Sequence, residues 1–426
     1  MSDSLQTSAV REPEFRTGSG AICAAHITDA ALLSQLETTE PLACEFCEEI
    51  AGGVTVDSLE NALIDAVYYL YQSPDEAGVS YVTAEGGYIG AEIIDSWDAV
   101  HDLTESAIDD DYHHHFVTLY TPSVEDRLLT PRFQETDPKT WAWAWKQFEA
   151  DVKNGSRFIF FERNALSTST PSSRSAEFLM GLRRFLDPEY GLVKVLETGT
   201  EFFRGRLTKD ADSKLSSAKD LGPATPEIAA ANRMSPAGIP MFYASQNPET
   251  AVAEIASHAV RNFARIGTFK NTRPLEILDL SVPPRLYSPF DVDNRHKNNF
   301  LKFLIEFAQN VAKPIIPDGR PHVEYVPTQV ITELFRWTPG YDLDGIKLAS
   351  AQDGKDTFVF FYDALYVADE GADEGADETT SSPKPAPVFI LDPGSVITYK
   401  IKRNIVATAI QTSEQKMVPT PPPELL

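Results

Sequence analysis

The sequence has few cysteines: among 426 residues only Cys23, Cys44 and Cys47 carry a thiol. Three unevenly placed cysteines cannot form the disulfide framework that stabilises small secreted domains. A chain of this length can bury most of its apolar surface, so it needs neither disulfide bonds nor a metal ion to fold. The length also predicts two or three domains rather than one.

Long apolar runs are missing as well. Residues 1–20 are polar and include Asp3, Glu12 and Glu14, so they lack the apolar segment of a secretory signal. No other stretch of the sequence approaches the apolar length that a membrane span requires. We therefore expect a cytoplasmic protein that does not enter a membrane.

Positive charge is scarce, because 37 Lys and Arg residues face 63 Asp and Glu residues, a net charge of −26. Such a surface repels a polyanion unless basic residues gather in a patch, and the sequence contains no cluster of that kind. Nucleic acid is therefore a poor candidate partner. The acidity fits either a basic protein partner or a well-solvated surface, and solvation is the commoner explanation.

The remaining composition divides the chain into two folded regions. Residues 1–20 resemble a disordered lead-in, and residues 166–175 are rich in Ser, Thr and Pro, as linkers are. The ranges 21–165 and 176–413 are then the two domains, and 414–426 is a Pro-rich tail.

An acidic repeat interrupts the second domain. The unit Ala-Asp-Glu-Gly recurs from residue 368 and gives way to a segment rich in Ser, Pro and Lys. This composition cannot bury a core, so residues 368–386 are predicted to be a disordered insertion between two strands.

The first domain is predicted to be helical. Asp57-Ser58-Leu59-Glu60 has the form of a capping box before an apolar helical face that extends to Leu70. Trp141, Trp145 and Phe148 follow helical spacing within a second helix at 139–152. A short buried strand is expected at 157–162.

The second domain alternates short strands with helices, and we expect an α+β fold for the chain. Helices are expected at 176–186, 249–263, 298–312 and 328–335. Strands are expected at 201–207, 241–244, 275–280, 357–362, 388–391 and 396–401.

Three stretches beside predicted strands carry polar residues suited to chemistry. Arg204 and Arg206 lie two apart on a strand, so they point to one side of the sheet, where paired guanidinium donors suit a pyrophosphate. From this stretch alone, a strand with surface salt bridges is the simpler interpretation.

The second stretch delivers Tyr243 at the end of a strand and then Glu254 on a largely apolar helix. A carboxylate in that setting lies either at the solvent edge or in a site, at a cost in desolvation. In the third stretch Ser350 follows an apolar segment, but no Gly-x-Ser-x-Gly motif supports a serine hydrolase.

Taken together, Arg204, the spacing Tyr243-x10-Glu254 and Ser350 resemble the RES domain over about residues 190–410. The stretch at 325–333 also looks like RES proteins that have an additional N-terminal region. Cys44-Glu45-Phe46-Cys47 and the Trp-bearing helix are similar to the HEPN-like helical domain that precedes some RES domains.

This resemblance implies an ADP-ribosyltransferase-like mixed sheet behind a helical N-terminal domain. It also implies that NAD+ is a substrate, with no further cofactor, and that its nicotinamide–ribose bond is cleaved with water or phosphate as acceptor. The enzyme would be a glycohydrolase or phosphorylase, and a toxin held inactive by an Xre-type antitoxin. ADP-ribosyl transfer to a macromolecule and an inactive binding module are the alternatives.

The resemblance also assigns roles to residues. Arg204 would hold the pyrophosphate, with Arg206 and Arg233 as further phosphate contacts. Tyr243 would offer a flat face to nicotinamide. Glu254 would stabilise the developing positive charge or hold the ribose hydroxyls, and Ser350 would hydrogen-bond the substrate.

A metal site is not predicted. Cys44-x2-Cys47 has the spacing of half a zinc site, but no second Cys pair follows, and buried thiols or a local turn are the favoured interpretation. His113, His114 and His115 could supply ligands only if folding brought them close. The Arg-x4–6-His motif of HEPN ribonucleases is missing from the sequence, so the first domain is interpreted as a regulatory or docking module.

Overall fold

The computed structural model describes residues 20–47, 49–132, 138–158, 171–257, 261–312, 321–372 and 385–402. The chain divides into two compact units, the first made of 1–184 and 282–313 and the second of 185–281 and 314–426. The fold is α+β, as predicted, with a large mixed sheet in the C-terminal part. Within the described ranges, no helix combines the length and the apolar character that crossing a membrane requires.

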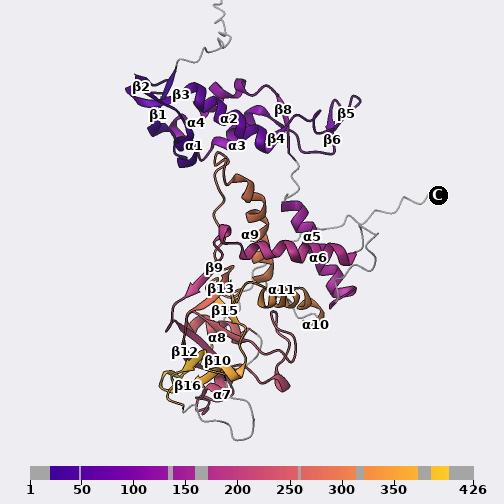
Figure 1. Cartoon of the computed structure of the whole chain (residues 1–426), viewed down its shortest axis with the longest axis vertical. Helices are drawn as coiled ribbons and strands as arrows, with labels where there is room; N and C mark the ends of the chain where they lie inside the picture. Colours follow the sequence, from indigo (N-terminus) through magenta and orange to yellow (C-terminus); the bar gives the residue numbers. More distant parts are fainter. Residues whose placement is uncertain are drawn as a thin grey trace, which may run out of the picture. The chain divides into compact units, whose positions relative to one another are not determined.

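The first unit begins with a lobe in which helices pack beside small sheets (Figure 1). Strand β3 lies between β1 and β2, and β8 lies between β4 and β7. The helices and strands of this lobe are β1 (Ala21–Cys23), η1 (Ala24–His26), α1 (Ala30–Gln35), β2 (Thr38–Ala43), β3 (Ile50–Thr55), α2 (Val56–Leu70), β4 (Tyr71–Gln72), β5 (Ser80–Val82), β6 (Gly87–Ile89), β7 (Ile94–Asp95), α3 (Ser96–Thr104), α4 (Asp110–Tyr120), η2 (Thr121–Ser123) and β8 (Leu128–Pro131).

Helix α2 starts earlier than the sequence suggested. Thr55 is its N-cap, and the Thr55 side chain accepts a hydrogen bond from the Ser58 amide at 3.2 Å. The predicted capping box at 57–60 is therefore wrong, because those residues already lie inside the helix. The first turn moves back because Val56, directly after the cap, is buried in the core of the lobe.

Three further helices of the first unit share one aromatic cluster: α5 (Pro138–Asn154), α6 (Pro171–Leu182) and α9 (Asn298–Ala312). The Trp141 ring lies 5.0 Å from that of Phe303 and 6.0 Å from that of Phe178, measured between centroids. Helix α5 confirms the helix predicted at 139–152. Because aromatic side chains of α6 and α9 pack on α5, both helices belong to the first unit, whereas the sequence placed them in the second domain.

The segment between α5 and α6 differs from its prediction where it is described. Arg157 donates to the carbonyls of Val152 and Lys153 at the end of α5, and Phe158 is 91% exposed, so neither residue starts a buried strand. Residues 171–175, predicted as linker, are the first turns of α6. The lead-in at 1–19, residues 159–170, most of the acidic insertion and the tail lie outside the described residues.

The second unit is built on a ten-stranded sheet in which β16, β17, β12, β10, β11, β15, β14, β13 and β9 follow one another, and β18 also pairs with β12 (Figure 1). Its strands are β9 (Val193–Leu196), β10 (Glu201–Thr208), β11 (Phe242–Ser245), β12 (Phe263–Asn271), β13 (Leu275–Asp279), β14 (Gly345–Ala349), β15 (Asp356–Phe360), β16 (Val367–Asp369), β17 (Phe389–Leu391) and β18 (Ile397–Lys400). The helices include α7 (Ala218–Leu221), α8 (Pro248–Ala256), α10 (Pro321–Glu324) and α11 (Val326–Trp337).

The sheet is almost divided between β10 and β11. The register joins these strands at one position, Phe203 opposite Ser245, whereas β10 pairs with β12 along its whole length from Glu201 to Thr208. Strand β11 pairs along its whole length with β15 on its other side. The two halves of the sheet therefore separate beyond Phe203, and backbone groups there need partners other than a neighbouring strand.

The two faces of the sheet pack against different elements. Fully buried phenylalanines, including Phe202, Phe242 and Phe389, form the core on one face together with Leu221 of α7. On the other face Phe203 and Leu207 contact the cluster around Ala251 of α8. Alternation along β10 thus directs Phe202, Arg204 and Arg206 toward the α7 side.

The predicted strands of this unit are confirmed, but β9, β12, β14 and β16 were missed. The helix predicted at 249–263 ends at Ala256, and the β-strand begins at Phe263. Part of the predicted insertion is also structured, because Ala368 and Asp369 belong to β16 and pair with β17. The prediction of a disordered insertion at 368–386 is therefore wrong for residues 368 and 369.

Candidate active site

Arg204 and Arg206 lie on one side of β10, as predicted, but their donors meet the protein's own backbone. Arg204 donates to the carbonyls of Leu221, Gly222 and Tyr243. Arg206 donates to those of Asp220 and Gly222. The two guanidinium groups therefore hold the C-terminal end of α7, where the unsatisfied helix carbonyls favour a positive charge.

The position of Arg204 follows from the divided sheet. Its bond to the Tyr243 carbonyl supplies a donor to β11 just beyond the last position at which β10 pairs with that strand. Burial lowers the pKa of Arg204 to about 9, helped by the nearby charge of Arg206, so the guanidinium is still protonated at neutral pH. Three of the five N–H donors of Arg204 thus bond backbone carbonyls in the described part of the chain. The role of Arg204 in holding a pyrophosphate stays a prediction.

Tyr243 is half-buried on β11, and its hydroxyl lies 2.9 Å from the Ser235 hydroxyl. Burial raises the pKa of Tyr243 to about 12. At neutral pH the phenol is therefore protonated, and it can orient a ligand or donate a hydrogen bond but cannot act as a base.

Glu254 and Ser350 are in direct contact. The Ser350 hydroxyl donates to Glu254 Oε1 at 2.5 Å, although the two residues are 96 positions apart in the chain. Ser350 is 5% exposed and also accepts a hydrogen bond from the Gln352 amide at 3.1 Å. Its hydroxyl can therefore orient the Glu254 carboxylate, and the predicted hydrogen bond from Ser350 to a substrate stays a prediction.

Secondary structure fixes both members of this pair. Asn247 caps α8, and Thr250 in the first turn donates to Asp353 at 2.6 Å, in the turn that follows Ser350. Ser350 directly follows β14, which pairs with β15 from Gly345 to Ala349. Two hydrogen bonds thus connect α8 to the segment that follows β14: Thr250 to Asp353 and Ser350 to Glu254.

Arg233 connects this pair to Tyr243. Burial lowers the pKa of Arg233, whereas Tyr325, Glu254 and Tyr243 favour its charged form in that order. The sequence ranked Arg233 below Arg204, but in the structure it is Arg233 whose charged form the Glu254 carboxylate favours.

Helix α11 holds the loop that carries Arg233. Thr328 donates to the Arg233 carbonyl, and Gln329 donates to the carbonyls of Asn232 and Ser235. Sequence reasoning missed these supports as well as Asp353. The stretch at 325–333 resembled RES proteins in the sequence, but nothing in it predicted that α11 would bond the loop that carries Arg233.

The structure thus places Ser350 against Glu254 and Arg204 against the Tyr243 carbonyl, and both Glu254 and Tyr243 favour the charged form of Arg233. Two cavities of the second unit, of about 340 and 530 Å³, are lined by other residues, such as Lys209 and Arg261 or Arg273 and Tyr341. The predicted site residues are therefore gathered by hydrogen bonds and charge rather than around either of these spaces.

Comparison with known families finds two domains in the chain. Residues 206–378 match the family model of the RES domain, a range that contains Arg206, Arg233, Tyr243, Glu254 and Ser350. This chain is a RES-domain protein. Arg204 lies two positions before the matched range.

The N-terminal part of this RES protein matches a second family model. Residues 37–166 match HEPN/RES N-terminal domain 1, so the recognition of both domains from the sequence is confirmed. RES domains are associated with enzymes that act on NAD+. Neither a curated protein nor a solved structure matches the chain.

One other cluster has the geometry of a ligand set, in the first unit. We call it the Cys3His cluster, and it consists of Cys23, His26, Cys44 and Cys47. The sequence argument recognised only the Cys44-x2-Cys47 half. The second half was present as Cys23-x2-His26, a mixed pair that a search for Cys pairs does not find. His113 is not part of the cluster, because its ring bonds the Thr104 hydroxyl at 3.0 Å.

Proposed function

We propose that this RES protein degrades NAD+ by cleaving the bond between nicotinamide and ribose, with water or phosphate as acceptor. The observation that carries the proposal is the hydrogen bond from Ser350 to Glu254 beside Arg233, within the range that matches the RES domain. The proposed reaction needs no cofactor, because NAD+ is itself the substrate.

The chemistry requires a fixed negative charge. When the glycosidic bond breaks, its electron pair leaves with neutral nicotinamide, and positive charge develops on the ribose carbon and ring oxygen. A carboxylate held in place stabilises this charge without having to reorganise during the reaction. Ser350 fixes the orientation of the Glu254 carboxylate, and an acceptor oxygen then forms the new bond to the ribose carbon. Water gives up a proton to solvent in this step, whereas an anionic phosphate oxygen has none to lose.

The cationic residues suit the other part of the substrate. A pyrophosphate carries negative charge that guanidinium groups bind through paired hydrogen bonds. We assign this role first to Arg233, because Arg204 and Arg206 donate to backbone carbonyls and hold α7 and the divided sheet. Tyr243, protonated at neutral pH, would place its ring against nicotinamide.

The decisive assay is incubation of the purified protein with NAD+, with and without phosphate, followed by separation of nicotinamide from ADP-ribose products. We expect nicotinamide release by the wild type and a loss of at least about 100-fold in Glu254→Gln, which keeps the shape of the side chain but removes its charge. Glu249→Gln is the matched control, because Glu249 is an exposed carboxylate on the same helix. Full activity in Glu254→Gln would contradict the assignment.

The acceptor is identified in the same experiment. Free ADP-ribose indicates hydrolysis, and its phosphate ester indicates phosphorolysis. Radiolabel from the adenine half of NAD+ that becomes attached to protein would instead indicate ADP-ribosyl transfer. A wild-type protein that leaves NAD+ intact under all of these conditions would refute the proposed function.

A growth assay tests the biological consequence. Expression of a NAD+-degrading toxin should lower cellular NAD+ and arrest growth, and Glu254→Gln should relieve both effects. Growth arrest by Glu254→Gln with normal NAD+ would show that toxicity has another cause.

A further inference from the structure

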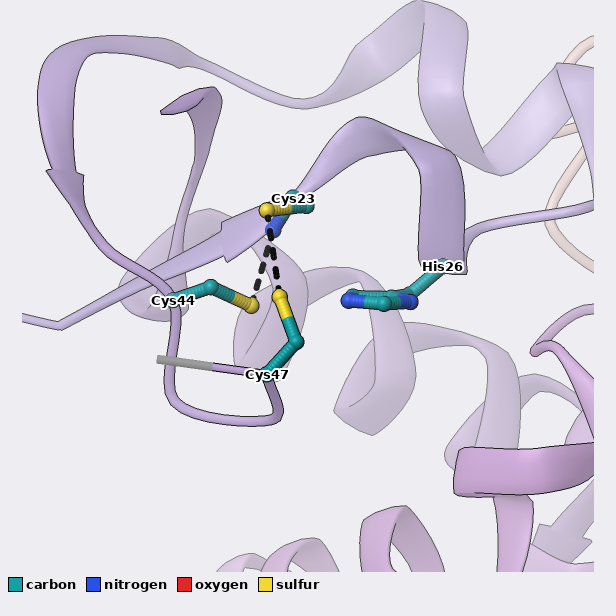
Figure 2. A group of neighbouring side chains, drawn as sticks. All are labelled: Cys23, His26, Cys44 and Cys47. Atoms are coloured by element: carbon teal, nitrogen blue, oxygen red, sulfur yellow. Dashed lines mark hydrogen bonds between the residues drawn. The ribbon is translucent and has the colours of Figure 1, made fainter. Parts of the chain in front are cut away.

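The Cys3His cluster lies where two segments of the first unit meet. Cys23 ends β1 and His26 ends the short helix η1 that follows, while Cys44 and Cys47 lie in the loop from β2 to β3 (Figure 2). Strand β3 pairs with both β1 and β2. The sheet therefore brings a Cys-x2-His turn and a Cys-x2-Cys turn to the same point.

The distances within the cluster fit a tetrahedral metal ion. The sulfur atoms of Cys23 and Cys47 are 3.8 Å apart, and the four candidate ligand atoms all lie within 4.8 Å of one another. A zinc ion binds thiolates at about 2.3 Å in tetrahedral geometry, which requires sulfur–sulfur distances of about 3.8 Å. The thiol pair already has that separation, and every other pair of candidate ligand atoms lies within 4.8 Å.

Backbone amides are directed at one sulfur of the cluster. Cys44 Sγ accepts hydrogen bonds from the amides of Cys23, at 3.3 Å, and Phe46, at 3.4 Å. A neutral thiol is a weak acceptor, whereas a thiolate is stabilised by such donors and is the form that binds metal. Two donors on one buried sulfur therefore point to a ligand rather than to an inert core residue.

His26 provides an independent observation. The ring is 9% exposed, and Nε2 is buried with no hydrogen-bond partner among the described residues. Figure 2 shows the outer edge of this ring directed toward the sulfur atoms. Tyr112 and Phe46 hold the ring, with centroids 4.1 and 5.7 Å away. A buried imidazole nitrogen without a partner is costly, and a metal ion at the cluster would remove that cost.

We propose that the Cys3His cluster binds one structural Zn2+ ion. Three thiolates and one imidazole in tetrahedral arrangement select zinc over harder cations, which prefer oxygen ligands. Because four protein ligands fill the coordination sphere, the ion has no open position for a substrate, and its role is to fasten β1 to the β2–β3 loop. Two of the ligands, Cys23 and His26, precede the range that matches HEPN/RES N-terminal domain 1, so the site extends that domain toward the N-terminus.

The test uses the full chain purified under reducing conditions. We expect one zinc per chain by elemental analysis. Replacement of zinc by Co2+ should produce the visible bands of a tetrahedral ion and near-ultraviolet bands from thiolate-to-cobalt charge transfer. These bands report the ligands directly in the unmodified protein. Reduced protein that holds no stoichiometric zinc and shows no such cobalt bands would overturn the proposal, as would a Cys23–Cys47 disulfide in the purified chain.

Variants then identify the ligands. Cys47→Ser and His26→Asn should lower zinc affinity by more than about 100-fold in competition with a chromophoric chelator, since even loss of a supporting residue costs 10- to 100-fold. His26→Cys should retain zinc and add charge-transfer intensity, which separates ligation from a packing role. His114→Gln is the control, because His114 is an exposed histidine of α4 outside the cluster. Equal loss of zinc in His114→Gln and His26→Asn, or unchanged affinity in Cys47→Ser, would refute the ligand assignment.

Discussion

Removing the Ser350 hydroxyl tests how the carboxylate of this RES protein is held. In Ser350→Ala, Glu254 Oε1 loses a donor at 2.5 Å, while the cavity created is only one oxygen atom in size. Ser350 is 5% exposed, so water cannot readily take the place of the hydroxyl. The substitution therefore releases the carboxylate without removing it.

The magnitude follows from the type of bond. A hydrogen bond to a charged group contributes about 1.5–3 kcal/mol. If that contribution is made in the transition state, kcat for nicotinamide release falls roughly 10- to 150-fold, since each 1.36 kcal/mol is a factor of ten. KM should stay close to the wild-type value, because Ser350 orients Glu254 and does not itself bind the substrate.

The assay is steady-state nicotinamide release by wild type, Ser350→Ala, Glu254→Gln and the double variant. The double variant should be no slower than Glu254→Gln, because the hydroxyl acts only through the carboxylate. Ser257→Ala is the control, since Ser257 donates to the backbone carbonyl of Glu254 and not to its side chain. A Ser350→Ala variant with wild-type kcat, or with a defect confined to KM, would refute the reasoning.

Three further outcomes follow from the structure. Arg204→Ala should lower the free energy of unfolding in urea by about 3 kcal/mol, because three backbone carbonyls lose a charged donor, and a change below about 1 kcal/mol would contradict that role. The raised pKa of Tyr243 favours the folded state below pH 10, and this contribution should disappear between about pH 10 and 12, so the unfolding free energy of Tyr243→Phe should lack that decrease. Thr55→Ala should lower the free energy of unfolding in urea by about 1 kcal/mol, because it removes the N-cap of α2. Asp57→Asn should lower the same free energy by less, since Asp57 already lies inside the helix.

Local patterns predicted most elements of the fold. The helix that begins after Asn247 and the strand at 201–208 carry their signals within a few residues, and both are confirmed. Strand β12 was missed because Gly267 and Asn271 weaken the alternation of apolar and polar residues along it. Its position between β10 and β17 depends on strand pairing, which the local sequence does not show. A Cβ at Gly267 would lie 2.6 Å from the Leu391 side chain, on a strand far along the chain, so a larger residue there would displace that side chain.

The candidate site was predictable in its residues but not in their contacts. The spacing of Tyr243 and Glu254 on a strand–loop–helix was readable, and the resemblance to the RES domain added Ser350 and the arginines. The partner of each side chain was not readable. Ser350 bonds Glu254, and Arg204 bonds backbone carbonyls, because the positions of β14 and α7 bring those groups within reach.

By itself, the sequence determined the residue types able to carry the chemistry, because these depend on local spacing and short motifs. Both domain families and the α+β class followed from the resemblance of those motifs to known families. Only the tertiary structure decided that the sheet divides beside Arg204, that Ser350 reaches Glu254, and that the turn at Cys23–His26 meets Cys44 and Cys47. Each of these contacts joins distant segments. Their register depends on how strands pair and how buried side chains pack, which no local pattern specifies.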